Sequence, residues 1–301
     1  MELLTIFTPT WNREKKLKDT YDSLKKQNNK NFIWLIVDDG SSDNTEEEVK
    51  IWQKESDFRI IYKKKKNGGK HTAYNYALQF LETKYVYLSL DSDDTMYADD
   101  SVDKIIHELR GLKNEVGLIT LCTNSKDNKN DFLKKYEIEK LYNKSLSYAY
   151  ANNLFKAEGR MILRSDYVKK FKYPEIQGEY FFTEAYTYYQ MDGIVKWTDI
   201  LTCYSEYLAD GYTASIVKLF VKNPVAWYMY NEIRAKKTND FLCRLKYYVY
   251  YVSFALLSKK QIFKKELNYL LIVFVFPISL LGVFYLKAKG KNTIKRINQC
   301  S

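Results

Sequence analysis

Three aspartates within four positions, Asp91, Asp93 and Asp94, follow an apolar run that begins at Tyr85. A short apolar run that ends in acids is typical of a buried strand whose carboxyl end meets solvent. Because grouped carboxylates are costly to bury without a cation, we expect this cluster to face a metal or a polar ligand. Mg²⁺ and Mn²⁺ bind carboxylate oxygens and complete their shells with substrate phosphates. The pattern therefore indicates a divalent-cation site, and an acidic loop that binds nothing is the alternative.

Three more polar clusters follow apolar runs earlier in the chain. They are TPTWNR at 8–13, DDGSS at 38–42 and NGGK at 67–70. Side chains alternate along a strand, so Asp91 and Asp93 would point to one side if the strand continues through them. The lysines at 63–66, next to the third cluster, are expected to be an ordinary solvated run.

The elements that must position these clusters alternate between strands and helices. The apolar runs that predict strands are 3–7, 32–37, 59–62, 85–90 and 116–122. Between them, apolar residues recur at helical spacing, and Asp43 with Glu46 is a plausible capping pair for one helix. This alternation predicts an α/β fold with a doubly wound, mostly parallel sheet. Ligands of such sheets bind outside the carboxyl ends of the strands, where all four clusters are expected.

Composition excludes several other kinds of site. The chain has 301 residues, four widely spread cysteines without a CxxC pair, and two histidines. A disulfide framework and a zinc site are therefore not indicated, and a metal here would be bound by oxygen. The first residues lack the basic and apolar pattern of a secretory signal, which makes a cytoplasmic location the default expectation.

Basic charge is concentrated near the carboxyl terminus. Residues 241–301 carry eleven Lys or Arg and one acid, a net +10 of the +11 for the whole chain. This distribution argues against nucleic acid as the partner of the globular part. The same region holds an uncharged apolar run at 269–286, interrupted by Pro277 and flanked by lysines that would attract anionic lipid. We expect association with an anionic membrane surface, as a crossing or as an in-plane insertion, and a buried pair of core helices is the alternative.

The four clusters together resemble the motifs of family 2 glycosyltransferases with the GT-A fold, of the type that builds bacterial cell-surface polysaccharides. The resemblance covers roughly residues 1–125 and becomes looser beyond them. It implies a Rossmann-like, mostly parallel twisted sheet flanked by helices, with a helical, membrane-associated extension at the carboxyl end. The expected parts are a nucleotide-sugar-binding half at 1–125, an acceptor-binding half at 126–225, and a helical, basic segment at 226–301.

The resemblance also implies roles on the donor side of the site. The loop formed by Pro9, Thr10, Trp11 and Arg13 would pack on the base, and Asp39 would accept hydrogen bonds from uracil or ribose. Asp91 would meet ribose or sugar hydroxyls. Asp93 would hold the Mn²⁺ or Mg²⁺ that bridges the diphosphate, and Asp91 and Asp94 are further candidate ligands. Lys70 would add a positive charge near the phosphates at the amino end of the helix that it opens.

Inverting transfer also needs a base that takes the proton of the acceptor hydroxyl. In the family this base is an acid downstream of the donor site, and the matching place here is residues 183–185. Glu184 is therefore the candidate, on an expected aromatic-rich helix. The sequence departs from the family, because the usual acidic pair is reduced to one acid. Glu179, five residues earlier, stays open as the alternative.

The expected activity is metal-dependent, inverting transfer of a hexosyl or N-acetylhexosaminyl group from a nucleotide sugar, with a UDP-sugar favoured. The expected acceptor is a lipid-linked or cell-surface glycan, and the expected place is the cytoplasmic face of the cell membrane, peripheral, monotopic or single-span. A nucleotidyltransferase that acts on sugar phosphates is one alternative, but it predicts a glycine-rich basic signature where this chain has TPTWNR. A non-catalytic membrane adaptor is the other, and it leaves the acidic strand ends unexplained.

Overall fold

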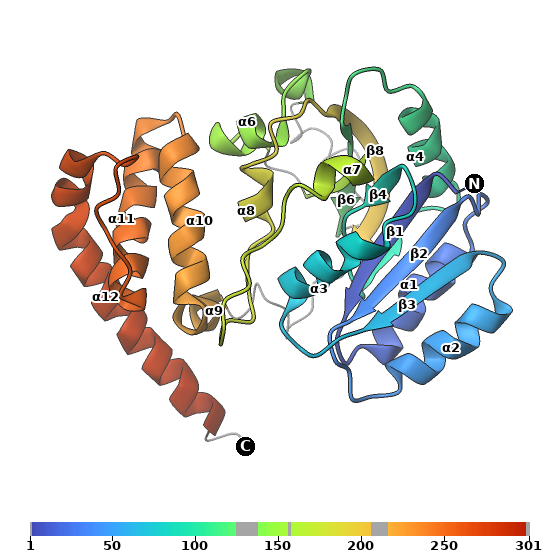
Figure 1. Cartoon of the computed structure of the whole chain (residues 1–301), viewed down its shortest axis with the longest axis horizontal. Helices are drawn as coiled ribbons and strands as arrows, with labels where there is room; N and C mark the ends of the chain where they lie inside the picture. The colour runs from blue at the N-terminus through green and yellow to red at the C-terminus, as the bar shows by residue number, and fades with distance from the viewer. Residues whose placement is uncertain (1, 125–137, 156–157, 206–215, 299–301) are drawn as a thin grey trace. The chain divides into compact units, whose positions relative to one another are not determined.

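The computed structural model describes residues 2–124, 138–155, 158–205 and 216–298 (Figure 1). The contacts within the chain divide it into two compact units, which we call the sheet unit and the helical unit. The sheet unit comprises Met1–Ala149, Asn153–Lys172 and Gln190–Tyr207, and the helical unit comprises Tyr150–Asn152, Tyr173–Tyr189 and Leu208–Ser301.

A mixed, mostly parallel sheet forms the centre of the sheet unit. Its described strands are β1 (Leu4–Thr10), β2 (Phe32–Asp38), β3 (Arg59–Lys64), β4 (Tyr85–Tyr87), β5 (Asp94–Met96), β6 (Gly117–Thr123), β7 (Gly159–Arg164) and β8 (Lys196–Ser205). They lie in the order β3-β2-β1-β4-β7-β6-β8-β5. The pairs β1–β2, β2–β3, β1–β4 and β6–β8 are parallel, whereas β7 and β5 run antiparallel to their neighbours. The predicted α/β class with a GT-A-like sheet is confirmed.

Two strand ends differ from the prediction. Strand β1 continues to Thr10, because Pro9 and Thr10 stay in register with Val37 and Asp38 of β2. The predicted loop therefore begins only at Trp11. Strand β4 stops at Tyr87, and the acidic cluster that follows is a turn closed by a hydrogen bond from the amide of Asp94 to the carbonyl of Asp91, 2.9 Å.

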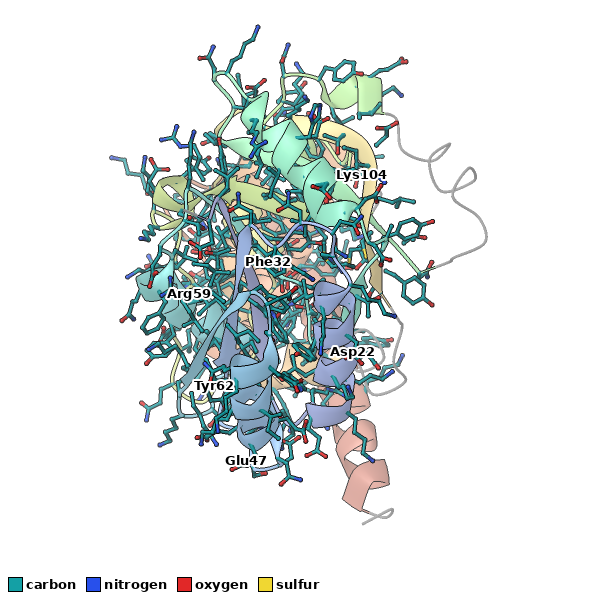
Figure 2. The ribbon with its side chains drawn as sticks, turned by 90° about the vertical axis from the view of Figure 1, so that its right-hand side faces the viewer. Asp22, Phe32, Glu47, Arg59, Tyr62 and Lys104 are labelled. Atoms are coloured by element: carbon teal, nitrogen blue, oxygen red, sulfur yellow. The ribbon has the colours of Figure 1, made fainter. Side chains whose placement is uncertain are left out.

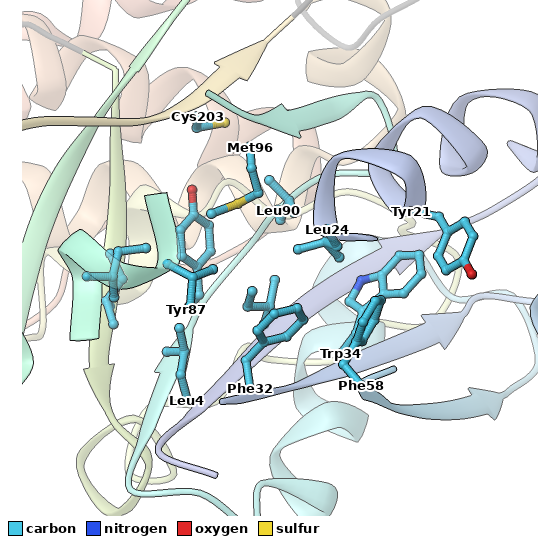
Figure 3. Packing of buried hydrophobic residues seen from close by; sticks show 14 of the residues in the cluster. Leu4, Tyr21, Leu24, Phe32, Trp34, Phe58, Tyr87, Leu90, Met96 and Cys203 are labelled. Carbon is cyan, nitrogen blue, oxygen red and sulfur yellow. The ribbon is translucent and has the colours of Figure 1, made fainter. Parts of the chain in front are cut away.

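Helices cover both faces of this sheet. Helices α1 (Glu14–Lys25), α2 (Thr45–Glu55) and α4 (Ser101–Arg110) pack with alternate residues of β1 and β2 into one core cluster. Within this cluster Tyr21 stacks on Trp52, with ring centroids 4.6 Å apart. It also stacks on Trp34, with ring centroids 6.1 Å apart (Figure 3). On the other face, Phe7 of β1 meets Tyr74 of α3 (Lys70–Ala77). Alternation of side chains thus gives the central strands β1 and β2 two buried faces.

Strand β3 forms one edge of the sheet, with Arg59 and Tyr62 along it (Figure 2). The hydroxyl of Tyr62 donates to the carboxylate of Asp38 at 2.5 Å, which fixes the carboxyl end of β2. The shorter elements that connect the sheet are η1 (Leu78–Phe80), η2 (Ile138–Leu141), α6 (Leu146–Ala151) and α7 (Ser165–Val168).

The helical unit contains α8 (Ala185–Tyr188), α9 (Ile216–Lys222), α10 (Pro224–Lys237), α11 (Phe241–Ser258) and α12 (Tyr269–Asn298). Its core cluster is built mainly from α10, α11 and α12. Helix α11 lies against α10 on one side and α12 on the other (Figure 1). A glutamate holds the amino end of α10, because the carboxylate of Glu179 accepts from the amides of Val225 and Ala226 at 2.8 Å each.

The sheet unit takes strands from beyond the predicted nucleotide-binding half. Strands β7 and β8 lie in the range 126–225 that was expected to form the acceptor half, yet both belong to the central sheet. Within that range, residues 126–137, 156–157 and 206–215 lie outside the described part of the chain. The three-part division therefore stays a prediction.

Candidate active site

The first two polar clusters are joined directly by hydrogen bonds. The amide of Asn12 donates to the Ser41 hydroxyl at 2.9 Å, and the amide of Ser42 donates to the Asn12 side chain at 2.8 Å. Asn12 adopts a left-handed backbone conformation, φ 51°, which asparagine tolerates better than most residues. In addition, the amide of Asp39 donates to the Thr10 carbonyl at 2.8 Å. The ends of β1 and β2 thus form one connected surface.

Asp39 connects the second cluster to the third. Its carboxylate accepts from the amides of Gly68 at 3.0 Å and Gly69 at 2.6 Å, and from the Lys65 ammonium at 2.7 Å. Gly69 has φ 94°, a conformation that favours glycine. Lys65 was expected to be a solvated member of a lysine run, and that expectation is wrong. Only one of the four lysines reaches Asp39, so composition alone could not distinguish it.

Lys70 connects the third cluster to the fourth. Its ammonium lies 2.7 Å from the carboxylate of Asp91, which also accepts a hydrogen bond from Ser89. Burial opposes ionisation of Asp91, but the charges of Lys70 and Arg160 outweigh this effect and lower its pKa. Lys70 therefore opens α3 and pairs with an acid of the fourth cluster, and its expected role toward phosphates stays a prediction.

Asp93 is the acid of this cluster that has no ion pair with a described side chain. Its pKa is raised by burial and by the negative charge of Asp91, while Lys70 and Arg13 act in the opposite direction. A carboxylate held close to a second carboxylate gains most from a cation. Asp91 and Asp93 therefore fit a hard divalent ion whose other ligands come from a phosphate-bearing substrate.

Asp94 differs from the other two acids in its surroundings. Its side chain is almost fully buried, and its carboxylate lies 2.7 Å from the guanidinium of Arg160 on β7. Burial raises the pKa of Asp94 to about 6, although Arg160 opposes this shift. Among the described residues, no group of three or more acidic, histidine or cysteine side chains is placed to hold a metal. The expected metal ligation by Asp91, Asp93 and Asp94 stays a prediction, and Asp94 is the most buried of the three.

Trp11 and Arg13 lie on the loop after β1, whereas Pro9 and Thr10 are buried at the end of the strand. Trp11 is 54% exposed, an unusual value for a tryptophan, and its ring is accessible to a flat ligand. The roles of Pro9 and Thr10 would therefore be exerted through the backbone and the shape of the loop.

Comparison with known proteins agrees with this arrangement. A model of the family described as Glycosyl transferase family 2 matches residues 5–171, more than half of the chain. The chain belongs to glycosyl transferase family 2. Among related sequences, the putative teichuronic acid biosynthesis glycosyltransferase TuaG of Bacillus subtilis is 32% identical over 98 residues, which are 32% of this chain and 38% of that protein.

Two solved structures share the fold. S. aureus TarS 1-349 in complex with UDP-GlcNAc has a TM-score of 0.52 at 17% identity, covering 84% of this chain and 71% of that chain. The mannosyltransferase PcManGT from Pyrobaculum calidifontis in complex with GDP-Man and Mn²⁺ has a TM-score of 0.55 at 16% identity, covering 96% and 83%. The chain spans between 15% and 59% of the length of the first curated relatives that it matches.

The two candidate bases of this family 2 glycosyltransferase both lie in the helical unit. Glu184 precedes α8, which has four residues and is far shorter than the aromatic-rich helix expected there. Its backbone carbonyl accepts from the hydroxyls of Tyr173 at 3.3 Å and Thr187 at 3.0 Å, and its side chain is partly exposed. Glu179 instead uses both carboxylate oxygens on the first amides of α10, while burial raises its pKa. The choice between the two glutamates as the base stays a prediction.

Two residues of the site region were missed by sequence reasoning. Arg160 was not considered, because it follows the acidic cluster by 66 residues and lies on a strand that was not predicted. Lys65 was discounted as part of a charge run. A signal existed for Arg160, since an arginine within the otherwise apolar stretch GRMIL implies a buried acidic partner.

Proposed function

We propose that this family 2 glycosyltransferase moves a hexosyl or N-acetylhexosaminyl group from a UDP-sugar to a lipid-linked or cell-surface glycan, with inversion. The hydrogen-bonded chain from Asn12 through Asp39 and Lys70 to Asp91 carries the proposal. It joins all four clusters at one edge of the sheet, and Asp93 beside it forms no ion pair with a side chain in the described part of the chain. UDP-GlcNAc in TarS and teichuronic acid biosynthesis for TuaG support the donor and the acceptor class.

Each donor-side residue has a role that its surroundings support. Trp11 stacks on the base, and Asp39 orients uracil or ribose while it holds the glycine turn. Asp91 and Asp93 would hold Mn²⁺ or Mg²⁺, which when bound would supply positive charge against the charge that grows on the departing diphosphate. We assign Asp94 to positioning of the turn and not to the metal, because its side chain is 2% exposed, against 34% for Asp91, and pairs with the buried Arg160.

On the acceptor side, Glu184 takes the proton of the attacking hydroxyl. A carboxylate can serve this role when it reaches the hydroxyl. Glu179 is the less suitable of the two candidates, since both of its carboxylate oxygens hold the amino end of α10. The described residues include one helix, Tyr269–Lys289, that is long and apolar enough to cross a membrane, which by itself is weak support for attachment to the cytoplasmic face of a membrane.

Thermal unfolding with UDP, with and without Mn²⁺, tests the donor site. The wild type should gain stability from UDP, and more from UDP with Mn²⁺, because a ligand that binds only the folded state raises its stability. Asp93→Asn should lose the Mn²⁺-dependent gain and about 10²–10³-fold of the transfer rate, since a charge-stabilising contact is removed. Asp99→Asn, at a nearby exposed aspartate, is the matched control and should behave as wild type. Full metal-dependent stabilisation of Asp93→Asn would refute the metal assignment.

A further inference from the structure

Helix α12 presents a broad apolar surface on the side away from α11. The apolar residues on this side have exposed fractions between 39% and 81%. They are Leu270, Val273, Phe274, Ile278, Leu280, Leu281, Phe284 and Tyr285. Exposed apolar side chains this numerous on one helix mark an interaction surface. Lys287 and Lys289 follow directly at its end.

The opposite side of α12 is fixed to α11. Ile272, Val275, Ser279 and Val283 are buried at helical spacing on this side. The Ser253 hydroxyl of α11 donates to the Ser279 carbonyl at 3.1 Å. The two helices run in the same direction, because Tyr248 bonds to the residue before α12, Asn268, while Ser253 meets Ser279 farther along.

The segment between the two helices, residues 259–268, is irregular and lies against α11 and α10. The hydroxyl of Tyr251 in α11 donates to the carbonyls of Gln261 at 3.2 Å and Ile262 at 2.9 Å. Lys264 forms an ion pair with Glu232 of α10 at 2.5 Å. The segment therefore runs back along α10 and α11, beside the first half of α12. It carries four lysines within residues 259–265.

We propose that α12 lies in the plane of an anionic membrane, with its exposed apolar side in the acyl region of one leaflet and the lysines at the headgroups. This inference rests on the membrane association proposed above and specifies its geometry. An apolar helix face beside clustered lysines fits this occupant, because apolar burial and attraction to anionic lipid act together.

A perpendicular crossing is disfavoured by the neighbours of α12. Helix α11 and the segment 259–268 are bound alongside it, so a crossing would carry them into the hydrocarbon. Irregular backbone exposed to lipid does not occur at that depth, and a lysine at the bilayer centre costs about 2.5–3.5 kcal/mol on insertion scales. An in-plane helix avoids both costs, since only its outer side enters the acyl region.

Depth measurements along α12 distinguish the two geometries. We would place single spin labels at Leu270, Ile278 and Tyr285 of the full chain, in a background with Cys243 and Cys300 replaced by serine. The protein would be bound to mixed phosphatidylcholine and phosphatidylglycerol vesicles, and accessibility to oxygen and to a water-soluble nickel complex would give each depth. An in-plane helix predicts similar depths at the three positions. A shallow, deep, shallow series would overturn the in-plane geometry while leaving membrane association intact.

A surface variant tests the contact itself. Phe274→Glu with Leu281→Glu should lower vesicle partitioning at least about a hundredfold, because two large apolar side chains no longer enter the membrane. Ile51→Glu, at an exposed apolar position of α2 that is 52% accessible, should bind vesicles as wild type. Stabilisation by UDP and Mn²⁺, measured on the same samples, reports the donor site separately and should be unchanged. The wild type could instead fail to bind vesicles and form a dimer that the double variant does not form. In that case a second copy of the chain covers the exposed side of α12, and the inference is wrong.

Discussion

Asp94 and Arg160 show how one buried ion pair supports the acidic turn. Arg160 crosses from β7 to the first residue of β5, and both side chains are largely removed from water, at 12% and 2% exposure. Arg160 is thus a buried cation next to a turn that holds three acids within four positions. A buried charge that loses its partner is much more costly than an exposed one.

Arg160→Met should therefore destabilise the protein by about 3–5 kcal/mol, because Asp94 would remain buried without its partner. Chemical denaturation measures this loss. Adding Asp94→Asn to the same variant should recover a large part of it, since the uncompensated charge is gone. An additive loss in the double variant would contradict the pairing.

The two glutamates of the helical unit make opposite predictions. Glu184→Gln should reduce turnover severely and leave UDP binding unchanged, because the base acts only on the acceptor. Glu179→Gln should keep most turnover but lower stability by about 1 kcal/mol, since a charged cap at the amino end of α10 becomes neutral. Steady-state kinetics and thermal unfolding of both variants show which glutamate is the base and which one caps α10. A turnover defect confined to Glu179→Gln would exchange the assignments.

At the scale of elements, periodicity predicted the first strands and helices well and failed at their ends. The apolar runs around Ile6, Trp34 and Val86 all became central strands. The strand predicted over 85–90 ends at Tyr87, and the acidic cluster forms a turn because the amide of Asp94 bonds back to the carbonyl of Asp91. Strand β7 escaped prediction since its neighbours in the sheet, β4 and β6, come from distant parts of the chain. Local patterns carry no information on such partners.

Asp43 is a second case in which a local sequence pattern did not predict the partner found in the structure. It was expected to pair with Glu46 as a capping box, whereas its carboxylate accepts from Thr45 and from the amide of Glu14 in α1, 3.2 Å away. Glu46 instead pairs with Lys50 and Lys64. The residue therefore ties two helix starts together, a contact that no window along the sequence contains.

The acid stability of the protein should depend on Asp43. Burial opposes ionisation of Asp43, but hydrogen bonds from Thr45 and Glu14 outweigh it and lower its pKa. A lowered pKa contributes stability above the unfolded value near 3.8, and this contribution is lost as the pH falls through the folded pKa. Asp43→Asn should thus lose stability at pH 7 and approach wild type in acid. Parallel pH profiles of unfolding free energy for the two proteins would refute this.

At the scale of the whole molecule, the sequence showed that basic charge is concentrated near the carboxyl terminus. It did not show which lysines are paired with a carboxylate. Lys264 is held by Glu232, while Lys265 has no ion pair with a described side chain and is exposed. A lysine already neutralised by a carboxylate attracts anionic lipid less.

Lys265→Gln should weaken binding to anionic vesicles by about 1 kcal/mol, roughly fivefold, at low salt. Lys264→Gln should weaken it less, because its charge is matched by Glu232. Sedimentation with vesicles at two salt concentrations measures both effects, and the difference should shrink as salt rises. Equal losses for the two variants would show that sequence position alone sets the attraction.

The bonds at the amino end of α10 have one more consequence. Asn223 accepts from the amides of Tyr180 and Phe181 at 2.8 and 3.0 Å, next to Glu179, so the chain leading to Glu184 is fastened to the helices that include α12. The proposed base and the proposed membrane contact thus belong to one unit. Under these two proposals, the height of the base above the bilayer would be a fixed property of that unit, and the unit would select acceptors whose hydroxyl stands at that height above their lipid anchor.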